Sequence, residues 1–296
     1  MTFRYLDRQQ TLAGRVSFSG VGLHTGVAVD LVLAPAPANT GVVFKRTDLE
    51  GFEIRAQAGN VARVAYATSL MRKGVLISTT EHLLSALAAM GVDNVCAEIS
   101  NVEVPILDGS ALPFVRGILA TGLKRQRARR YYIEMTKAVQ IAEGAKRIAI
   151  FPAAEFRVTC SIDFPHLLIG KQCVDGVFGA GNYEDEIAPA RTFQFLDKVE
   201  ELRNAGLVRG GSLQNAIVLS EDGVLNPEGL RFKDEFCRHK TLDLIGDFAL
   251  LGHPILGHVV ANRGGHALHY ALVSRLLQDK TSWRLVDSLK RESSAA

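Results

Sequence analysis

Residues able to bind a metal recur at helical spacing in the stretch Arg231–Asp247. His239 and Asp243 lie four residues apart, and Asp247 follows after four more, so the three side chains project from one face of a helix. The apolar residues that share this spacing are Phe236, Leu242, Ile245 and Phe248. A neutral imidazole and a carboxylate are two ligands of a catalytic metal, which usually takes three from the protein. Taken alone, the pattern is more typical of an exposed histidine–aspartate pair with a solvated acid below it.

A second stretch, Ser78–His82, precedes another apolar helix pattern and offers a third ligand. Ser78 and Glu81 fit a capping box, so one interpretation is that Glu81 caps this helix. That interpretation leaves His82 unexplained, because an imidazolium in the first turn would oppose the helix dipole, whereas a neutral, metal-bound imidazole would not. With the first stretch, His82 completes a set of two histidines and one aspartate, typical of a hydrolytic metal site. Glu81 is then placed to act as the general base.

The composition bounds the protein class. The chain has 296 residues, of which 47% are hydrophobic and 22% charged, enough for one large or two medium-sized domains with real cores. The net charge is +3 and the basic residues are scattered, apart from the run Lys124–Arg130. A nucleic-acid-binding surface normally shows a clearer basic stripe with interleaved aromatics, so we expect no nucleic-acid partner. A mild positive charge also suits a substrate that bears phosphates.

Cysteine usage and the N-terminus predict the compartment. Cys96, Cys160, Cys173 and Cys237 form no C-x-x-C pair, which fits a reducing compartment better than a disulfide framework. The first ten residues are polar and lack the apolar core of a signal peptide. No apolar run reaches the ~18 residues that a membrane span needs. We therefore expect a cytoplasmic protein without a transmembrane segment.

The two halves of the chain repeat one pattern. Val21–Ala36 reads as a turn and a strand that ends in Pro-Ala, and Val139–Ala154 has the same order. In each half, the histidine-bearing helix is followed by a strand and a glycine-containing helix start, at Asp108–Leu112 and Gly264–Leu268. The repeat predicts pseudo-two-fold symmetry and an α+β fold of two similar domains. A metal that takes ligands from both copies would lie at the domain interface.

The basic, polar run at residues 125–130 is interpreted as a linker. The first domain would cover residues 1–124, with an insertion at about 55–77. The second would cover residues 131–296, with a larger insertion at about 166–215. Neither insertion has a clear counterpart in the other half, and long insertions often form walls or lids of functional sites.

Together, the motifs closely resemble those of the UDP-3-O-acyl-N-acetylglucosamine deacetylases of lipid A biosynthesis. The matching stretches are Ser19–Gly26, Pro35–Gly41, Ile77–Leu83, Pro105–Ser110, Ala190–Phe193, Arg231–Asp247 and Gly264–Leu268. The resemblance implies a zinc amidase of two sheet-on-helix domains with one catalytic Zn²⁺ between them. Its substrate would be a UDP-linked, acylated amino sugar, and we expect a monomer.

The resemblance also implies roles for individual residues. The zinc ligands would be His82, His239 and Asp243. Glu81 would be the general base. His266, held by Asp247, would stabilise the oxyanion or protonate the leaving amine. Without the resemblance, His266 is more typical of a loop histidine.

Further residues would contact the substrate. Thr192 would donate a hydrogen bond to the oxyanion, and Lys240 would bind polar or phosphate groups. Residues expected to bind the nucleotide-sugar are His24, Phe164, Phe193, Gly211 and Ser212. The later insertion would form an apolar passage for the acyl chain, lined by Val199, Leu202, Val208, Ala216 and Val218.

Three positions depart from the family pattern. Gln214 stands where Asp is usual, Asn262 lies in a stretch that is normally more Lys-like, and His269 stands where Asn is common. None is an expected metal ligand.

Other functions compete with this interpretation. A different metal hydrolase, such as a peptidase or a simple sugar deacetylase, would use the same ligand set, although the H-E-x-x-H helix is absent. An inactive zinc-binding scaffold would bind metal without turnover. An RNA-binding duplicated α/β domain would not need Glu81 beside His82.

Overall fold

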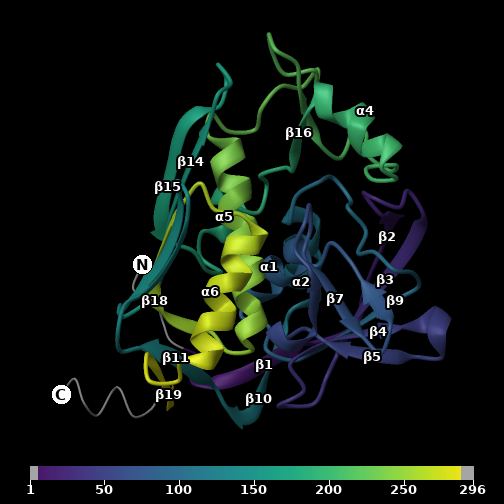
Figure 1. Cartoon of the computed structure of the whole chain (residues 1–296). Coiled ribbons are helices and arrows are strands. Elements are labelled where there is room, and N and C mark those ends of the chain that lie inside the picture. Colours follow the sequence, from purple (N-terminus) through teal and green to yellow (C-terminus); the bar gives the residue numbers. More distant parts are fainter. Residues whose placement is uncertain (1–5, 288–296) are drawn as a thin grey trace.

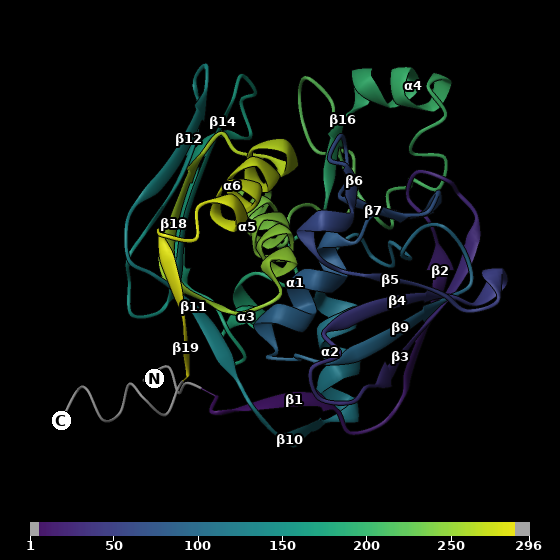
Figure 2. The same ribbon diagram turned by 60° about the horizontal axis from the view of Figure 1, so that its bottom comes forward.

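Two mixed β-sheets flank a central layer of helices in the computed structural model, which describes residues 6–287. The views in Figures 1 and 2 both show helices α1 and α5 between the two sheets. These helices are α1 (Glu81–Ala89) and α5 (Glu235–Phe248), and each has a second helix beside it, α2 (Leu112–Thr121) and α6 (His266–Gln278). The protein is therefore an α+β protein of two domains whose helices meet in the middle.

The first sheet has five strands in the order β2-β3-β9-β4-β5. Its strands are β2 (Val16–Val21), β3 (Ala28–Pro35), β4 (Val42–Arg46), β5 (Phe52–Arg55) and β9 (Val95–Ile99). In β3, buried Val29, Leu31 and Leu33 alternate with more exposed residues, because successive side chains of a strand point to opposite faces. The buried face packs on the helices, and the rings of Phe18 and Phe114 lie 5.1 Å apart.

The second sheet has seven strands within the described residues. Five of them are β12 (Val139–Glu143), β13 (Lys146–Phe151), β14 (Phe156–Phe164), β15 (Gly170–Val177) and β18 (Ile255–Asn262). The other two, β11 (Tyr131–Met135) and β19 (Trp283–Asp287), extend the sheet beside the start of β18.

The internal repeat is confirmed by the strand pairing. In the first sheet β3 pairs antiparallel with β2 and β9, and β4 pairs parallel with β9 and antiparallel with β5. In the second sheet β13 pairs antiparallel with β12 and β18, and β14 pairs parallel with β18 and antiparallel with β15. The two patterns are the same, so α1 and α5 are equivalent helices.

Parts of the two predicted insertions form small units of their own. The first contains the three-stranded sheet of β6 (Val61–Arg63), β7 (Ser69–Arg72) and β8 (Val75–Ile77). The second contains α3 (Tyr183–Glu186), β16 (Phe193–Phe195) and α4 (Leu196–Asn204), and β16 pairs with β17 (Ile217–Leu219). The second was predicted to begin at about residue 166, but β15 (Gly170–Val177) belongs to the second sheet and is the counterpart of β5, so it is part of the repeat. Short 3₁₀ turns occur at Thr47–Leu49, Ala58–Asn60 and Ala249–Leu251.

The segment predicted as a linker is regular structure. Most of residues 125–130 belongs to β10 (Leu123–Arg129), which pairs antiparallel with β1 (Arg8–Leu12). Two basic side chains of this run have acidic partners, since Arg125 bonds to Asp7 and Arg130 bonds to Asp93 at 2.8 Å. The run is basic and polar because it forms a solvent-facing two-stranded ribbon. In the sequence, such a composition resembles that of a linker.

Helices α1 and α5 approach each other closely at Gly246. A Cβ atom on Gly246 would lie 2.1 Å from the carbonyl oxygen of Glu81, closer than non-bonded atoms can approach. A residue with any side chain would push the helices apart, so glycine here allows the two domains to bring their helices together.

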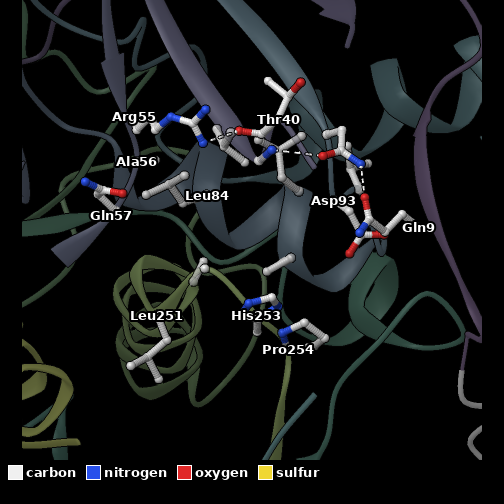
Figure 3. A pocket seen from close by; sticks show the side chains of 18 of the residues that line it. Gln9, Thr40, Arg55, Ala56, Gln57, Leu84, Asp93, Leu251, His253 and Pro254 are labelled. Atoms are coloured by element: carbon white, nitrogen blue, oxygen red, sulfur yellow. Dashed lines mark hydrogen bonds between the residues drawn. The ribbon is translucent and has the colours of Figure 1, made fainter. Parts of the chain in front are cut away.

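Two cavities, with volumes of about 530 and 660 Å³, lie beside the C-terminal ends of α1 and α5. Figure 3 shows the first, where the Arg55 side chain bonds to the carbonyl oxygen of Thr40 at 2.9 Å and His253 and Pro254 form the opposite wall. The second is more apolar and shares His253 and Pro254. Neither is lined by a residue predicted for the site.

The described residues also bear on two predictions from composition. All four cysteines are free. Among residues 6–287, none of the helices has the length and apolarity required to cross a bilayer.

Candidate active site

The three predicted metal ligands meet where α1 and α5 touch. His82 comes from the first turn of α1, whereas His239 and Asp243 lie one turn apart on α5. Oδ1 of Asp243 lies 3.4 Å from Nε2 of His239 and 3.7 Å from Nε2 of His82. One ligand atom from each residue lies within 4.8 Å of the others. Neighbouring domains therefore bring a possible three-ligand metal site together.

The ionisation of these groups suits a divalent cation. Burial, together with the nearby His239, lowers the pKa of His82 to about 3, so its imidazole is neutral at pH 7. Burial opposes ionisation of Asp243, but the neighbouring Lys240 and histidines hold its pKa well below the usual range. Nδ1 of His239 donates to the carbonyl oxygen of Ala190 at 3.0 Å, which leaves Nε2 with a free lone pair.

Glu81 does not cap α1. The residue before the helix is Thr80, with no side-chain capping bond, and Oε2 of Glu81 instead accepts a bond from the amide of Thr68 at 3.0 Å. Ser78, the other half of the expected capping box, contacts Ser69 at 3.0 Å. Burial raises the pKa of Glu81 to about 7, although the nearby His266 lowers it. The carboxyl group can therefore exchange a proton near neutral pH.

His266 begins α6 and is held by Asp247. Its Nδ1 atom donates to Oδ2 of Asp247 at 2.8 Å, and Nδ1 of His269 donates to the same oxygen at 2.8 Å. Burial opposes protonation of His266, but the Asp247 carboxylate raises its pKa to about 9. Burial likewise opposes ionisation of Asp247, yet the charge and hydrogen bond of His266 lower its pKa to about 2. At neutral pH this is a carboxylate–imidazolium pair.

Asp247 thus lies apart from the three ligands. It shares a face of α5 with His239 and Asp243, as the spacing predicted, but its oxygens are taken up by donors outside the ligand set. Asp247, His266 and His269 form a second compact group of possible ligand atoms.

The segment before β16 contacts the candidate site through the Ala190 carbonyl, which bonds to His239. The amide of Thr192 donates to the carbonyl oxygen of Gly109 at 2.8 Å, and the Thr192 carbonyl accepts the amide of Ile217 at 2.8 Å. The preceding residue, Arg191, is buried and bonds to the fully buried Glu235 at 2.9 Å. These bonds fix both Thr192 and the Ala190 carbonyl that bonds to a histidine of the ligand set.

Aromatic rings and one lysine face the same region. Phe193 lies 5.8 Å from the ring of Phe164 and 6.4 Å from that of His239, measured between centroids. Nζ of Lys240 lies 5.6 Å from the Phe193 ring centroid and donates to Oδ2 of Asp243 at 2.8 Å. Lys240 was predicted to meet the substrate, and in the structure it bonds to a predicted metal ligand.

A model of the UDP-3-O-acyl N-acetylglycosamine deacetylase family matches residues 9–278 of this sequence. The chain belongs to this deacetylase family. It is 52% identical over 278 residues to the UDP-3-O-acyl-N-acetylglucosamine deacetylase of Solibacter usitatus, an alignment that covers 94% of each chain. It is 47% identical over 285 residues to the Myxococcus xanthus protein of the same name, covering 96% of this chain and 91% of the relative. The Syntrophotalea carbinolica protein of that name is 45% identical over 281 residues.

The turn that carries His24, a predicted substrate contact of this deacetylase family member, is held in place by a buried carboxylate. The backbone amides of His24 and Thr25 donate to the buried carboxylate of Glu103 at 2.9 Å each. Within the described residues, both ring nitrogens of His24 are buried and make no hydrogen bond. Burial lowers the pKa of this imidazole, against the nearby Glu103. The contact of His24 with the substrate stays a prediction.

The loop predicted to bind substrate packs on that turn. A Cβ atom on Gly210 would lie 2.3 Å from the carbonyl oxygen of Gly22, and the Gly210 amide donates to the carbonyl of Leu23 at 3.0 Å. Gly211 and Ser212 follow directly, and the Ser212 amide is held by the side chain of Asn215 at 2.9 Å. His24 therefore shares one region with the Gly-Gly-Ser stretch of the deacetylase family.

The residues expected to line an acyl passage lie in the β16-α4-β17 unit or beside it. Leu202 and Ala216 are buried, at 6% and 8% exposure. Val199, Val208 and Val218 are half-buried. Their contact with an acyl chain stays a prediction.

Sequence reasoning missed Thr68, Glu103 and the Ala190 carbonyl, which contact Glu81, the His24 turn and His239 respectively. A threonine in an insertion belongs to no recognisable sequence motif, and a backbone carbonyl leaves no signal in the sequence. His269 was noted only as a departure from the deacetylase family, and the structure shows that it bonds to Asp247.

Proposed function

We propose that this chain is a zinc-dependent deacetylase that hydrolyses the N-acetyl group of UDP-3-O-acyl-N-acetylglucosamine. The products would be UDP-3-O-acyl-glucosamine and acetate, in lipid A biosynthesis. The observation that carries the proposal is the buried set of His82, His239 and Asp243 with Glu81 and His266 beside it. Membership of the deacetylase family supports the same substrate.

Zinc suits this donor set. Two neutral imidazoles and one carboxylate are common ligands of catalytic zinc, although the same ligands also bind other divalent metals. The ring contact of His82 and His239, with centroids 4.9 Å apart, leaves their Nε2 atoms on the same side as Asp243. When bound, the ion would polarise the amide carbonyl and lower the pKa of the attacking water.

Glu81 and His266 have complementary protonation states for amide hydrolysis. A carboxyl group with a pKa of about 7 is partly ionised at neutral pH and takes a proton from the attacking water. An imidazole with a pKa of about 9 is protonated there, so it stabilises the oxyanion or donates a proton to the leaving amine. Thr192 would add a hydrogen bond to the oxyanion.

The remaining residues would bind the nucleotide-sugar. The unpartnered ring nitrogens of His24 offer a donor and an acceptor to the sugar or diphosphate. Phe164 and Phe193 supply apolar ring surface, and Lys240 supplies a cation for substrate oxygens. Gly211 and Ser212 lie beside the His24 turn, and the apolar side chains of the second insertion would receive the acyl chain.

We further propose that the protein acts as a cytoplasmic monomer. Four free cysteines are typical of proteins from a reducing compartment. Both helices that carry the ligands come from one chain, so a partner is not required to complete the ligand set. The alternatives are another metal-dependent amidase, a simple sugar deacetylase or an inactive zinc-binding scaffold.

One experiment separates these possibilities. Metal analysis of the purified protein is combined with an acetate-release assay on UDP-3-O-acyl-N-acetylglucosamine, with and without a chelator. Acetate release that is lost with chelator and restored by Zn²⁺ is expected. Bound zinc without acetate release would instead indicate a scaffold or a different substrate.

A further inference from the structure

Thr68 contacts both titratable groups that flank the candidate metal site. Its backbone amide donates to Oε2 of Glu81 at 3.0 Å, and its hydroxyl donates to Oδ1 of Asp247 at 2.5 Å. The hydroxyl oxygen also lies 3.3 Å from Nδ1 of His266. Thr68 is 2% exposed, so bulk water does not compete for these bonds. One residue of the first insertion therefore links the proposed base to the proposed acid.

The position of Thr68 is itself fixed. Its carbonyl oxygen accepts the hydroxyl of Thr80 at 3.0 Å and the amide of Thr80 at 3.2 Å. Thr80 directly precedes Glu81, and Ser69 begins β7. Thr68 is thus held between α1 and the small three-stranded sheet, and its hydroxyl reaches across to α5 in the other domain.

The hydroxyl completes the donors around the Asp247 carboxylate. Oδ2 already accepts Nδ1–H groups from His266 and His269, each at 2.8 Å, whereas Oδ1 accepts the Thr68 hydroxyl. A buried carboxylate oxygen that loses its donor is costly, and here Asp247 is 2% exposed. Without the hydroxyl, the carboxylate would turn to find another donor and would carry the His266 ring with it.

We propose that Thr68 is a positioning residue for the deacetylation, an inference that rests on the proposed function. Through its amide and hydroxyl, it fixes Glu81 and the Asp247–His266 pair relative to each other across the reacting carbonyl. It acts through these groups and not on the substrate. Small misplacements of catalytic groups slow the chemical step far more than they weaken substrate binding.

Substitutions at position 68 test this role with little change in shape. Thr68→Val removes the hydroxyl and keeps the amide, and Thr68→Ser keeps both. Ser69→Ala is a matched control that removes a neighbouring hydroxyl, which bonds to Ser78 at 3.0 Å. We expect Thr68→Val to lower kcat by about 10- to 100-fold with KM within about 3-fold of wild type. Zinc content should be unchanged, and Thr68→Ser and Ser69→Ala should have near wild-type kcat.

A double variant shows whether Thr68 acts through Asp247. In an Asp247→Asn background, Thr68→Val should cause little further loss of kcat, because the group that it positions is already altered. Wild-type kcat in Thr68→Val would overturn the proposal, and so would an undiminished loss in the double variant. If Thr68→Val does not fold, Thr68→Ala takes its place in the same comparison with Thr68→Ser.

A spectroscopic measurement tests the inference independently of the substrate. In metal-free protein labelled with ¹⁵N-histidine, the Nδ1–H signal of His266 reports its bond to Asp247. This signal should shift or broaden in Thr68→Val and remain in Thr68→Ser and Ser69→Ala. An unchanged signal would overturn the positioning role even if the protein proved to act on another amide. Failure of the wild type to release acetate, with the signal altered as expected, would reject the proposed substrate alone.

Discussion

Lys240 donates a hydrogen bond to Asp243 across 2.8 Å and so occupies Oδ2, leaving Oδ1 to face the two histidines. The two oxygens of the carboxylate therefore have different partners. One oxygen is available to a metal, and the other is neutralised by an ammonium group that burial alone would disfavour. Burial opposes protonation of Lys240, but Asp243 raises its pKa above the usual value.

This difference predicts how Asp243→Asn behaves. The ammonium of Lys240 has only donors, so the amide oxygen of Asn would turn to it and the amide NH₂ would face the histidines. We expect zinc affinity to fall by at least ~10²-fold, more than the loss of an outer hydrogen bond would cause. Asp243→Ala, His82→Ala and His239→Ala should also lose zinc and yet remain folded.

Metal content after dialysis and thermal unfolding check these variants together. His166→Ala is the matched control, because that histidine bonds to the carbonyl of Ser220 at 2.8 Å away from the ligand set. Full metal content in all of the ligand variants would reject the assignment.

Asp247→Asn should move the alkaline limb of the pH–activity profile. Asp247 raises the pKa of His266 to about 9, against the effect of burial, and the proposed mechanism uses the protonated form. Activity is therefore present below this pKa and is lost as pH rises through it. Without the carboxylate charge, the imidazole should lose its proton ~1 unit lower or more.

In the proposed mechanism the acidic limb belongs to Glu81, which acts in its ionised form, and the position of this limb should change little. The profile of kcat/KM against pH checks both limbs. Superimposed profiles for Asp247→Asn and wild type would show that the pairing has no role in the reaction.

His269 offers a test of the departure from the family pattern. Its Nδ1 atom donates to Asp247 at 2.8 Å from a buried position. His269→Asn retains a donor and should keep kcat within ~3-fold, whereas His269→Leu removes the donor and should lower kcat by roughly 10-fold or more. Equal kcat values for the two variants would mean that this bond does not matter for turnover.

The acyl passage predicts a dependence on the lipid part of the substrate. Burial of an alkyl chain contributes about 0.8 kcal/mol per methylene, and part of such remote binding energy improves turnover. UDP-N-acetylglucosamine without the 3-O-acyl group should lose at least ~10²-fold in kcat/KM, about 2.7 kcal/mol. Equal rates on the two substrates would favour a simple sugar deacetylase.

Ala216→Glu tests where that chain binds. A carboxylate in an apolar passage is poorly solvated, so the variant should lose far more activity on the acylated substrate than on the bare one. Leu225→Glu is the control, since Leu225 is 41% exposed and pairs with Val218 through its amide. A parallel loss on both substrates, with a lowered unfolding temperature, would show that Ala216 is only part of the core.

Gly246→Ala should weaken the domain interface. The new methyl group would meet the Glu81 carbonyl at 2.1 Å, and relief of such a clash typically costs about 1–3 kcal/mol. Urea unfolding should show this loss, and kcat should fall because Glu81 is displaced. Gly223→Ala is the control, because its Cβ would meet nothing within 4 Å; similar stabilities of the two variants would contradict the proposed close approach.

Much of the site was predictable because helical spacing and duplication produce regular patterns in the sequence. The four-residue step from His239 to Asp243 places both on one face of α5, and the repeat places His82 on the equivalent helix. The strand pairing confirmed the repeat. Such regularities survive because one helix period and one sheet topology constrain many residues at once.

The remaining features depend on contacts between distant segments, which a sequence pattern does not encode. Thr68 and Asp247 are 179 residues apart in the chain, and nothing near either residue marks the other. The Ser78 and Glu81 pattern suggested a cap, but the fold offered Glu81 a buried amide instead. The basic run at 125–130 became a strand because β1 was available to pair with it.

The shared topology of the two sheets has a consequence for which side of the amide is attacked. Equivalent helices supply an equivalent pair, His82 and His239, which by itself cannot distinguish the two faces of an amide. Hydrolysis requires unlike groups on these faces, and they arise where the copies differ. Asp243 corresponds to Ala86, and Glu81 corresponds to Arg238, whose guanidinium bonds to Asp234 at 2.7 Å. In the proposed site, duplication would thus supply the metal-binding pair, and the divergence of the copies would determine on which side of the amide the water attacks and on which side the amine leaves.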